Sequence, residues 1–192
     1  TGNIDQTIEV EPLPTFGYNY STSIELDPAS GSEDLTDFPV LVQVSSAPIA
    51  DNLRTVSNGG HVENANGYDI VFFDENYSQL DHQIESYDPS TGVYNAWVRI
   101  PLLSHTSTTT IYMAYGNPGI SSDPSTTDVW ISSYKGVWHL NNDATDATAT
   151  GNDGTESNTA DIAGVIGGGM DFNGFNSYVQ FNPLTVMSGN DE

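Results

Sequence analysis

The residues of this sequence best suited to chemistry are four oxygen-bearing side chains in one polar tract. Asp143, Asp146, Asn152 and Asp153 lie close together and beside glycines. Calcium takes about six to eight oxygen ligands, which flexible loops of aspartate and asparagine can supply. The tract lacks the regular ligand spacing of an EF-hand, so two interpretations stay open. The four residues form a calcium site, or they form a solvated turn in which their side chains cap backbone groups.

A second acidic group surrounds a predicted strand and the turn that follows it. Its members are Asp69, Asp74, Glu75 and Asp81, and the turn Asp74-Glu75-Asn76 has the composition of a hairpin connection. We interpret these four carboxylates as turn residues and as charges at a strand edge, rather than as metal ligands.

Paired carboxylates could also hydrolyse a glycosidic bond. A retaining glycosidase needs two carboxyl groups about 5–5.5 Å apart, and an inverting enzyme places them farther apart. Glu9 with Glu11, and Asp81 with Glu85, have spacings that share one face of a strand. The first pair lies beside Pro12, a poor setting for a preorganised site. A glycoside hydrolase is therefore a minor alternative, and we expect no enzyme.

The histidines and hydroxyl residues give no catalytic or zinc-binding pattern. The four histidines are far apart, none of them has the His-x-x-x-His spacing of a zinc site, and the chain has no cysteine. No Gly-x-Ser-x-Gly nucleophile motif is present. His82 and His139 fall in predicted strands, so we expect them to be packed, hydrogen-bonded side chains.

Aromatic rings could form a platform on which a sugar stacks. Such rings more often build cores, because each buries a large apolar area, and we expect Trp97 and Trp138 to be core residues. The candidates for a sugar platform are Tyr18, Tyr20, Trp130, Tyr134 and Trp138.

Two Asn-x-Ser sequences could accept an N-linked glycan. They begin at Asn19 and Asn76. Both are candidate acceptors in a host that glycosylates its surface proteins.

The charge balance excludes several classes of partner. Three basic residues face 26 acidic ones, which gives a net charge of −23. Nucleic acids and anionic lipid headgroups would repel such a chain, and no apolar stretch is long enough to cross a membrane as a helix. The lack of cysteine and the acidic, lysine-poor composition favour a prokaryotic cell-surface or extracellular protein, with calcium in the place of disulfides.

The apolar pattern predicts an all-β chain. Short β-branched and aromatic runs recur between turn residues, and helical periodicity is almost absent. In Tyr94–Ile100 the alternate residues from Tyr94 share one face, as in a sheet with one covered side. The predicted strands are Thr7–Val10, Tyr18–Leu26, Val40–Val44, Asp69–Phe73, His82–Tyr87, Tyr94–Ile100, Thr109–Tyr115, Val137–Leu140, Gly168–Phe172 and Tyr178–Phe181.

A turn-rich segment divides the chain into two parts. We expect an N-terminal extension or linker strand over 1–15, an antiparallel β-sandwich over 16–118, a linker over 119–128 and a second β-segment over 129–192. The chain begins Thr-Gly-Asn without methionine, so we expect it to be a piece of a longer protein.

Five segments in order resemble a family of prokaryotic extracellular β-domains that is labelled only as a domain of unknown function. The resemblance covers about residues 16–118 and assigns no catalytic role to Asp81 or Glu85. The segments are Phe38–Val42, Gly67–Phe72, Leu80–Tyr87, Trp97–Pro101 and Tyr115–Pro118.

The second part resembles the opening of a laminin-G-like or concanavalin-A-like jelly roll. The resemblance rests on Gly136–Leu140, the polar loop to Thr155, Gly169–Gly174 and Tyr178–Val179. It implies a partial jelly roll in 129–192, because a complete one needs about twice as many residues. We therefore expect neighbouring domains or chains to complete this sandwich.

Together these features predict a structural and binding module of a cell-surface, adhesin-like protein. Its expected partners are a glycan or a surface protein, and calcium is its expected cofactor. The alternative is a subunit of a surface filament or sheath in which chains complete one another by strand addition.

Overall fold

The computed structural model describes residues 17–181, and the chain divides into two compact units between Val129 and Trp130. Unit 1 denotes the described residues up to Val129, and unit 2 denotes those from Trp130 onward. The predicted strand Thr7–Val10 and the Glu9/Glu11 pair lie outside the described residues.

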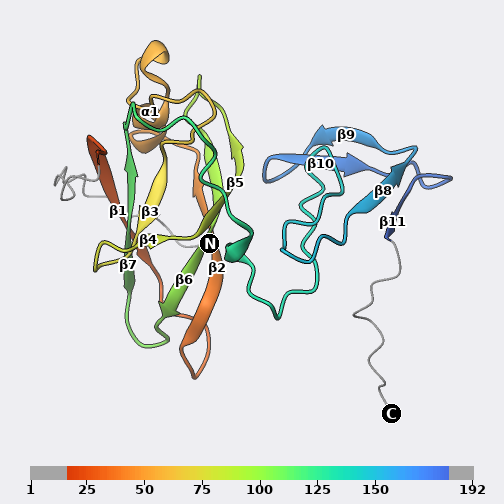
Figure 1. Ribbon diagram of the computed structural model, residues 1–192, viewed down its shortest axis with the longest axis horizontal. Helices are drawn as coiled ribbons and strands as arrows, with labels where there is room; N and C mark the ends of the chain where they lie inside the picture. Colours follow the sequence, from red (N-terminus) through yellow and green to blue (C-terminus); the bar gives the residue numbers. More distant parts are fainter. Residues whose placement is uncertain (1–16, 182–192) are drawn as a thin grey trace. The chain divides into compact units, whose positions relative to one another are not determined.

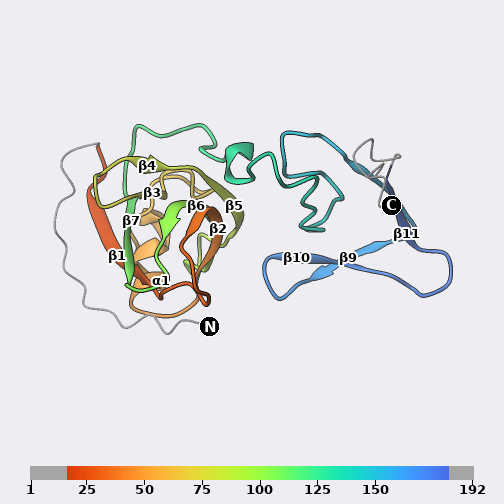
Figure 2. The same ribbon diagram turned by 90° about the horizontal axis from the view of Figure 1, so that it is seen from below.

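Unit 1 is a sandwich of two antiparallel sheets (Figure 1). One sheet has four strands in the order β1-β7-β3-β4, and the other has three in the order β2-β6-β5. Turned by 90°, the two sheets face each other (Figure 2). The strands are β1 (Tyr20–Leu26), β2 (Leu35–Val44), β3 (Val71–Phe73), β4 (Gln79–Leu80), β5 (His82–Tyr87), β6 (Tyr94–Leu103) and β7 (Thr109–Tyr115).

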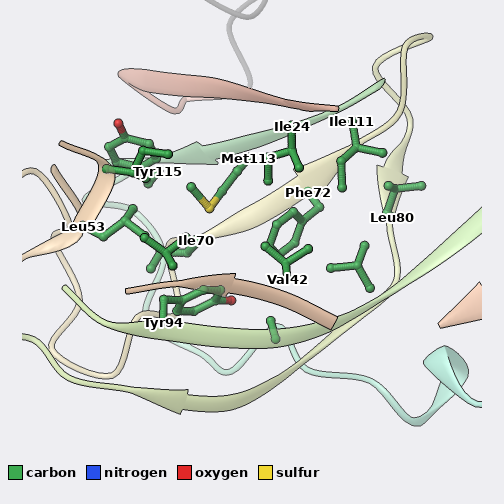
Figure 3. Close-up of a cluster of buried hydrophobic side chains, with 14 of the residues drawn as sticks. Ile24, Val42, Leu53, Ile70, Phe72, Leu80, Tyr94, Ile111, Met113 and Tyr115 are labelled. Atoms are coloured by element: carbon green, nitrogen blue, oxygen red, sulfur yellow. The ribbon is translucent and has the colours of Figure 1, made fainter. Parts of the chain in front are cut away.

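The core of unit 1 follows from the alternation of side chains along its strands. In β6 the residues Tyr94, Ala96, Val98 and Ile100 are all buried, whereas the alternate position Trp97 is only half-buried. Burial of such side chains stabilises the fold by about 1.5–3 kcal/mol each. Figure 3 shows this core, in which the labelled side chains are Ile24, Val42, Leu53, Ile70, Phe72, Leu80, Tyr94, Ile111, Met113 and Tyr115.

A short helix lies at one end of the sandwich (Figure 1), and two 3-10 turns occur elsewhere in unit 1. The helix α1 (Ile49–Leu53) buries Ile49, Ala50 and Leu53 because these positions share one face. It is followed by the 3-10 turn η1 (Val56–Asn58). A second 3-10 turn, η2 (Thr127–Val129), follows β7 and ends unit 1.

The last residues of the predicted linker are hydrogen-bonded to unit 1. The backbone N–H of Thr126 donates to the carbonyl oxygen of His82 at 3.0 Å. The N–H of Ile84 donates to Oγ of Ser125 at 3.1 Å, and Val129 is fully buried. This segment therefore covers part of the β5 edge, which would otherwise expose unpaired backbone groups.

Unit 2 consists of two antiparallel ribbons and a preceding loop. One ribbon pairs β10 with β9, and the other pairs β11 with β8. No residue of these four strands is buried, and the buried side chains lie in the loop before them, among them Ala144, Asp146 and Ala147. The strands are β8 (Gly154–Ser157), β9 (Ala160–Ala163), β10 (Gly168–Asp171) and β11 (Tyr178–Phe181).

The predicted all-β, antiparallel class is confirmed, with one strand wrong. Val137–Leu140 forms no strand. Only Trp138 makes an isolated bridge, to Asp146. The reason is local: the N–H of Val137 donates to the Asp146 side chain, and Leu140 has a positive φ of 55°. The strands at β5 and β7 begin and end where the sequence predicted them, whereas β4, β8 and β9 were not predicted.

Candidate functional site

Asp146 is the centre of the loop in which the sequence predicted calcium. As a residue, Asp146 is 6% exposed. Oδ1 accepts the N–H groups of Val137 and Thr148, both at 3.0 Å. Oδ2 accepts the N–H of Asn152 at 2.9 Å and the hydroxyls of Thr148 and Thr150 at 3.0 and 2.8 Å. Five donors of the chain therefore surround this one carboxylate.

These donors hold Asp146 ionised. Burial alone would raise its pKa, but the hydrogen bonds from Val137, Thr148 and Asn152 outweigh burial and lower the pKa to about 2. A carboxylate in this arrangement is satisfied by protein N–H and O–H groups. A cation at its oxygens would have to displace them.

The other three predicted calcium ligands are arranged around this centre in different ways. Asp153 Oδ1 accepts the N–H of Asp146 at 2.8 Å. The side chain of Asn152 donates to the carbonyl oxygen of Lys135 at 2.8 Å, and Asp143 Oδ1 accepts the N–H of Thr145 at 3.0 Å. The fold thus brings Asp146, Asn152 and Asp153 into one network and leaves Asp143 in a separate turn. Between residues 17 and 181 no group of three or more acidic, histidine or cysteine side chains is placed to hold a metal. Calcium here stays a prediction.

Unit 1 contains a second carboxylate centre, at Asp69. Asp69 does lie in a turn, which is one of the two roles expected from the sequence, but it is fully buried and so is no exposed edge charge. Oδ1 accepts the N–H of Asn64 at 2.9 Å, and Oδ2 accepts those of Glu63, Gly116 and Asn117 at 2.9, 3.1 and 3.3 Å. Asp69 therefore ties the loop before β3 to the end of β7. The sequence signal was its position directly before a run of apolar residues.

The other acids of the group Asp69, Asp74, Glu75 and Asp81 lie in the expected turn or form an ion pair. Asp74 does cap a turn, because its Oδ1 accepts the N–H groups of Asn76 and Ser78. Asp81 forms an ion pair with Arg99, and the indole N–H of Trp97 donates to Glu85 at 3.2 Å. The carboxylates of the Asp81/Glu85 pair are thus both engaged by β6.

The outer face of the β2-β6-β5 sheet carries rows of polar side chains. Arg99 pairs with Asp37 at 3.0 Å as well as with Asp81. Asn95 accepts a hydrogen bond from Gln43 at 3.1 Å and donates one to Ser86 at 2.8 Å. A bulge in β5 between Ile84 and Ser86 makes these rows irregular, as bulges redirect side chains. The Asn95 row spans β2, β6 and β5, and the Arg99 row joins β2 and β6 to Asp81, the residue just before β5.

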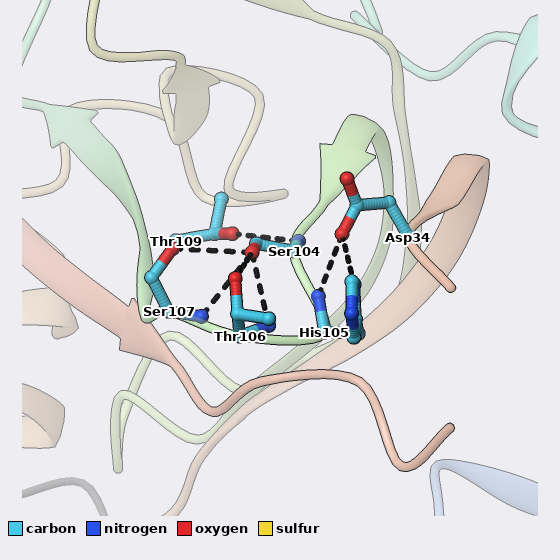
Figure 4. A network of polar contacts seen from close by, with 6 residues as sticks. All are labelled: Asp34, Ser104, His105, Thr106, Ser107 and Thr109. Atoms are coloured by element: carbon cyan, nitrogen blue, oxygen red, sulfur yellow. Dashed lines mark hydrogen bonds and ion pairs between the residues drawn. The ribbon is translucent and has the colours of Figure 1, made fainter. Parts of the chain in front are cut away.

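An aspartate, a histidine and several hydroxyl groups meet where β6 turns into β7 (Figure 4). Asp34 accepts hydrogen bonds from the backbone N–H of His105 and contacts its Nδ1 at 2.7 Å. These contacts, the backbone bond first, lower the pKa of Asp34. The Ser104 hydroxyl instead accepts the N–H groups of Thr106 and Ser107, both at 3.2 Å. The serine thus organises the turn. Within residues 17–181 no hydrogen bond joins its hydroxyl to the His105 ring, so the arrangement differs from a catalytic triad.

The two histidines predicted to be packed have different settings. His82 is buried against Phe72, with ring centroids 5.4 Å apart, and its Nδ1 lies 3.4 Å from the carbonyl oxygen of Leu80. Burial lowers the pKa of His82 below the ordinary value. His139 is half-buried, lies outside any strand and contacts the Trp130 ring.

The candidate sugar-stacking rings pack against other side chains of the chain. Tyr18 lies edge-on to Phe73, and Tyr20 is stacked between His61 and Tyr115. In unit 2, Trp130 contacts Tyr134, and Trp138 contacts Phe181. Trp97 and Trp138 are half-buried rather than fully buried core residues.

Part of the chain matches a known family. The model of that family, described as a domain of unknown function, covers residues 66–161. The match begins before β3, crosses the boundary between the units and includes both Asp69 and Asp146. It therefore differs in extent from the resemblance over 16–118. No curated protein and no solved structure matches the chain.

No helix among the described residues is long and apolar enough to span a membrane. The match covers 96 of the 192 residues. The chain thus belongs to the family named Domain of unknown function (DUF2341).

Proposed function

We propose that the chain is a structural and binding module of a cell-surface, adhesin-like protein, with unit 1 as a rigid spacer and unit 2 as the part that engages a neighbour. The observation that carries this proposal is the difference in burial between the units. Unit 1 encloses a core between two sheets. The four strands of unit 2 bury none of their residues.

The apolar side chains of unit 2 point to a missing cover. Val165 is fully exposed, Phe175 is 93% exposed, and Ile162, Phe172 and Tyr178 are each exposed by about half. Scattered apolar residues are ordinary on a surface, but a concentration of large ones in a short segment marks an interaction site. A two-stranded ribbon is only marginally stable alone, so these ribbons gain most by packing against further strands.

We propose that those further strands complete a laminin-G-like or concanavalin-A-like sandwich and that the completed module binds a glycan or a surface protein. The high negative charge of the chain restricts the glycan. Sulfated and uronic-acid polymers would be repelled, so neutral or amine-bearing sugars are the expected class. The role is non-catalytic, in keeping with the engagement of Asp81 by Arg99 and of Glu85 by Trp97.

The rival proposal is a filament subunit completed by strand addition from another copy. It is favoured by one observation: each of β8, β9, β10 and β11 pairs with a single neighbour among the described residues. Such strands leave one edge each for an added strand. The net charge of −23 opposes association of identical copies at low salt.

Sedimentation velocity separates the two proposals. The full chain is measured from about 1 to 100 μM in low salt and again in about 1 M salt, where charge repulsion is screened to about 3 Å. The module proposal predicts one monomeric species throughout. Growth of large species with concentration, strongest in high salt, would favour the filament.

Binding and turnover are then measured on the same sample. An array of neutral, amine-bearing and acidic glycans should retain the chain on members of the first two classes only. Release of reducing sugar from a β-glucan by the purified chain would overturn the non-catalytic role.

A further inference from the structure

The two Asn-x-Ser sequences of the chain lie in very different surroundings. Asn76-Tyr77-Ser78 occupies the connection between β3 and β4, and all three of its residues are exposed. Within residues 17–181 the structure shows no hydrogen bond from the Asn76 side-chain amide. Only the backbone of this segment is fixed.

Asp74 holds the backbone of this turn in place. Its Oδ1 accepts the N–H of Asn76 at 2.9 Å and that of Ser78 at 2.8 Å. The N–H of Tyr77 donates to the carbonyl oxygen of Asp74 at 3.0 Å, and Tyr77 has a positive φ of 60°. These bonds use backbone groups, so the Asn76 amide and the Ser78 hydroxyl stay outside the turn and accessible.

In Asn19-Tyr20-Ser21, the acceptor amide of Asn19 is hydrogen-bonded and Ser21 is buried. Asn19 as a residue is exposed, but its Nδ2 donates to the carbonyl oxygen of Gly116 at 2.8 Å. Ser21 is only 5% exposed and is paired with Ala114 in the β1-β7 ladder. A transferase could therefore reach this asparagine only after the start of β1 had separated from β7.

We propose that Asn76 is the N-glycosylation acceptor of the folded chain and that Asn19 is not. In the transfer, Nδ2 of Asn76 forms a bond to the anomeric carbon of an activated sugar. The bond from that carbon to the phosphate oxygen of the donor breaks, the phosphate group leaves, and a base of the transferase takes the amide proton. The proposal goes beyond the cell-surface module, and its test in vitro does not depend on where the protein resides.

The rings beside Asn76 provide a surface for the first sugar. Tyr77 is 40% exposed, and its ring centroid lies 5.8 Å from that of Tyr112 on β7. Apolar C–H faces of a sugar pack on such rings, and a glycan held there covers the end of the β1-β7-β3-β4 sheet. The glycan should therefore slow hydrogen exchange in Asp74–Ser78 without altering exchange in β5 or β6.

The test uses the purified, folded chain and an oligosaccharyltransferase that requires only the Asn-x-Ser/Thr triplet, with its lipid-linked oligosaccharide donor. Wild type, Asn76→Gln and Asn19→Gln are compared, and two synthetic peptides spanning residues 14–24 and 71–81 report reactivity without the fold. Intact mass gives the number of glycans, and mass spectrometry of peptides gives their position.

We expect one glycan on the wild type, located on Asn76, and glycans on both peptides. Asn76→Gln should lose the modification and keep the wild-type melting temperature, because the Asn76 side chain makes no hydrogen bond to any residue that the structure describes. Asn19→Gln should stay modified. Modification of the 71–81 peptide but not of Asn76 in the folded chain would overturn the proposal, as would equal modification of Asn19 and Asn76.

Discussion

Both units of the chain organise a loop around a buried aspartate, but they differ in what supports that loop. Asp69 accepts four backbone N–H groups and lies two residues before β3, whose three residues are all buried. Asp146 accepts three N–H groups and two hydroxyls, and the ribbons that follow it bury no residue. A loop organised by a buried aspartate thus occurs in unit 1, beside a large apolar core, and in unit 2, beside strands that bury no residue.

The comparison separates the stability that a hydrogen-bonded aspartate contributes from the stability that an apolar core contributes. A net hydrogen bond to a charged group contributes about 1.5–3 kcal/mol, which can close a loop but cannot replace a core that offsets the entropy of ordering a chain. The Asp69 centre adds to a sandwich that buries many apolar side chains. The Asp146 centre holds together a loop whose neighbouring strands bury none of their residues.

The largest expected effect is that of Asp69→Ala. Four N–H groups would lose their acceptor in the interior, so we expect the free energy of unfolding of unit 1 to fall by about 4 kcal/mol. Urea denaturation followed by near-UV circular dichroism measures this loss. The control is Asp74→Ala, which removes a smaller cap of two N–H bonds from an exposed turn, with an expected loss under about 1 kcal/mol. Equal losses for the two variants would contradict the importance of burial.

Asp146→Ala is the corresponding change in unit 2. We expect it to increase amide exchange at Val137, Thr148 and Asn152, whose N–H groups Asp146 accepts. Exchange in the core strands of unit 1 should not change. Increased exchange in β6 would show that the Asp146 loop of unit 2 also stabilises unit 1.

The next largest effect compares two isoleucines. Ile111 on β7 is 1% exposed, and Ile162 on β9 is 50% exposed. Ile111→Ala leaves a cavity and should cost about 3 kcal/mol, whereas Ile162→Ala should cost less than about 0.5 kcal/mol in this chain. Urea denaturation of both variants measures the difference. A cost above about 2 kcal/mol for Ile162→Ala would mean that Ile162 is covered in solution, for example by a second copy.

Much of unit 1 could be predicted from local patterns, because its strands alternate against one covered face. Tyr94, Ala96, Val98 and Ile100 show the alternation in sequence and the burial in the structure. The strands β8 and β9 were missed for the opposite reason. They have no covered face, so Gly154–Ser157 carries no apolar residue that would mark a strand.

The polar centres were harder to predict, because their partners depend on the fold. The sequence places Asp146, Asn152 and Asp153 in one loop, but not which backbone N–H groups point at which oxygen. For Asp69 the partners Gly116 and Asn117 are distant in sequence. Only the completed sandwich brings them to the start of β3.

A smaller effect concerns the pH dependence of unit 1. Burial lowers the pKa of His82. The hydrogen bond with Leu80 and the negative charges of Asp123 and Asp81 offset this lowering only in part. The unfolded chain therefore binds a proton at a higher pH than the folded chain, so stability should decrease as pH falls below about 6.5. Urea denaturation at pH 7, 6 and 5 measures this dependence, and His82→Gln should reduce its slope over that range. Asp146, with a pKa of about 2, should contribute a loss only below about pH 4.

The smallest expected effect is that of calcium on the Asp146 loop. The composition of the loop predicts a calcium site, but five donors of the chain already surround the carboxylate of Asp146. An ion at these oxygens would have to displace those donors before it gained a ligand. If those donors stay in place, the melting temperatures in EDTA and in millimolar calcium agree within about 1 °C, because calcium at a concentration far below its Kd adds almost no stability. A rise of several degrees in calcium would instead indicate a bound ion. If Asp143→Asn and Asp153→Asn abolish that rise, and Asp74→Asn in unit 1 leaves it intact, the calcium site lies in unit 2 and the donors around Asp146 do not prevent binding.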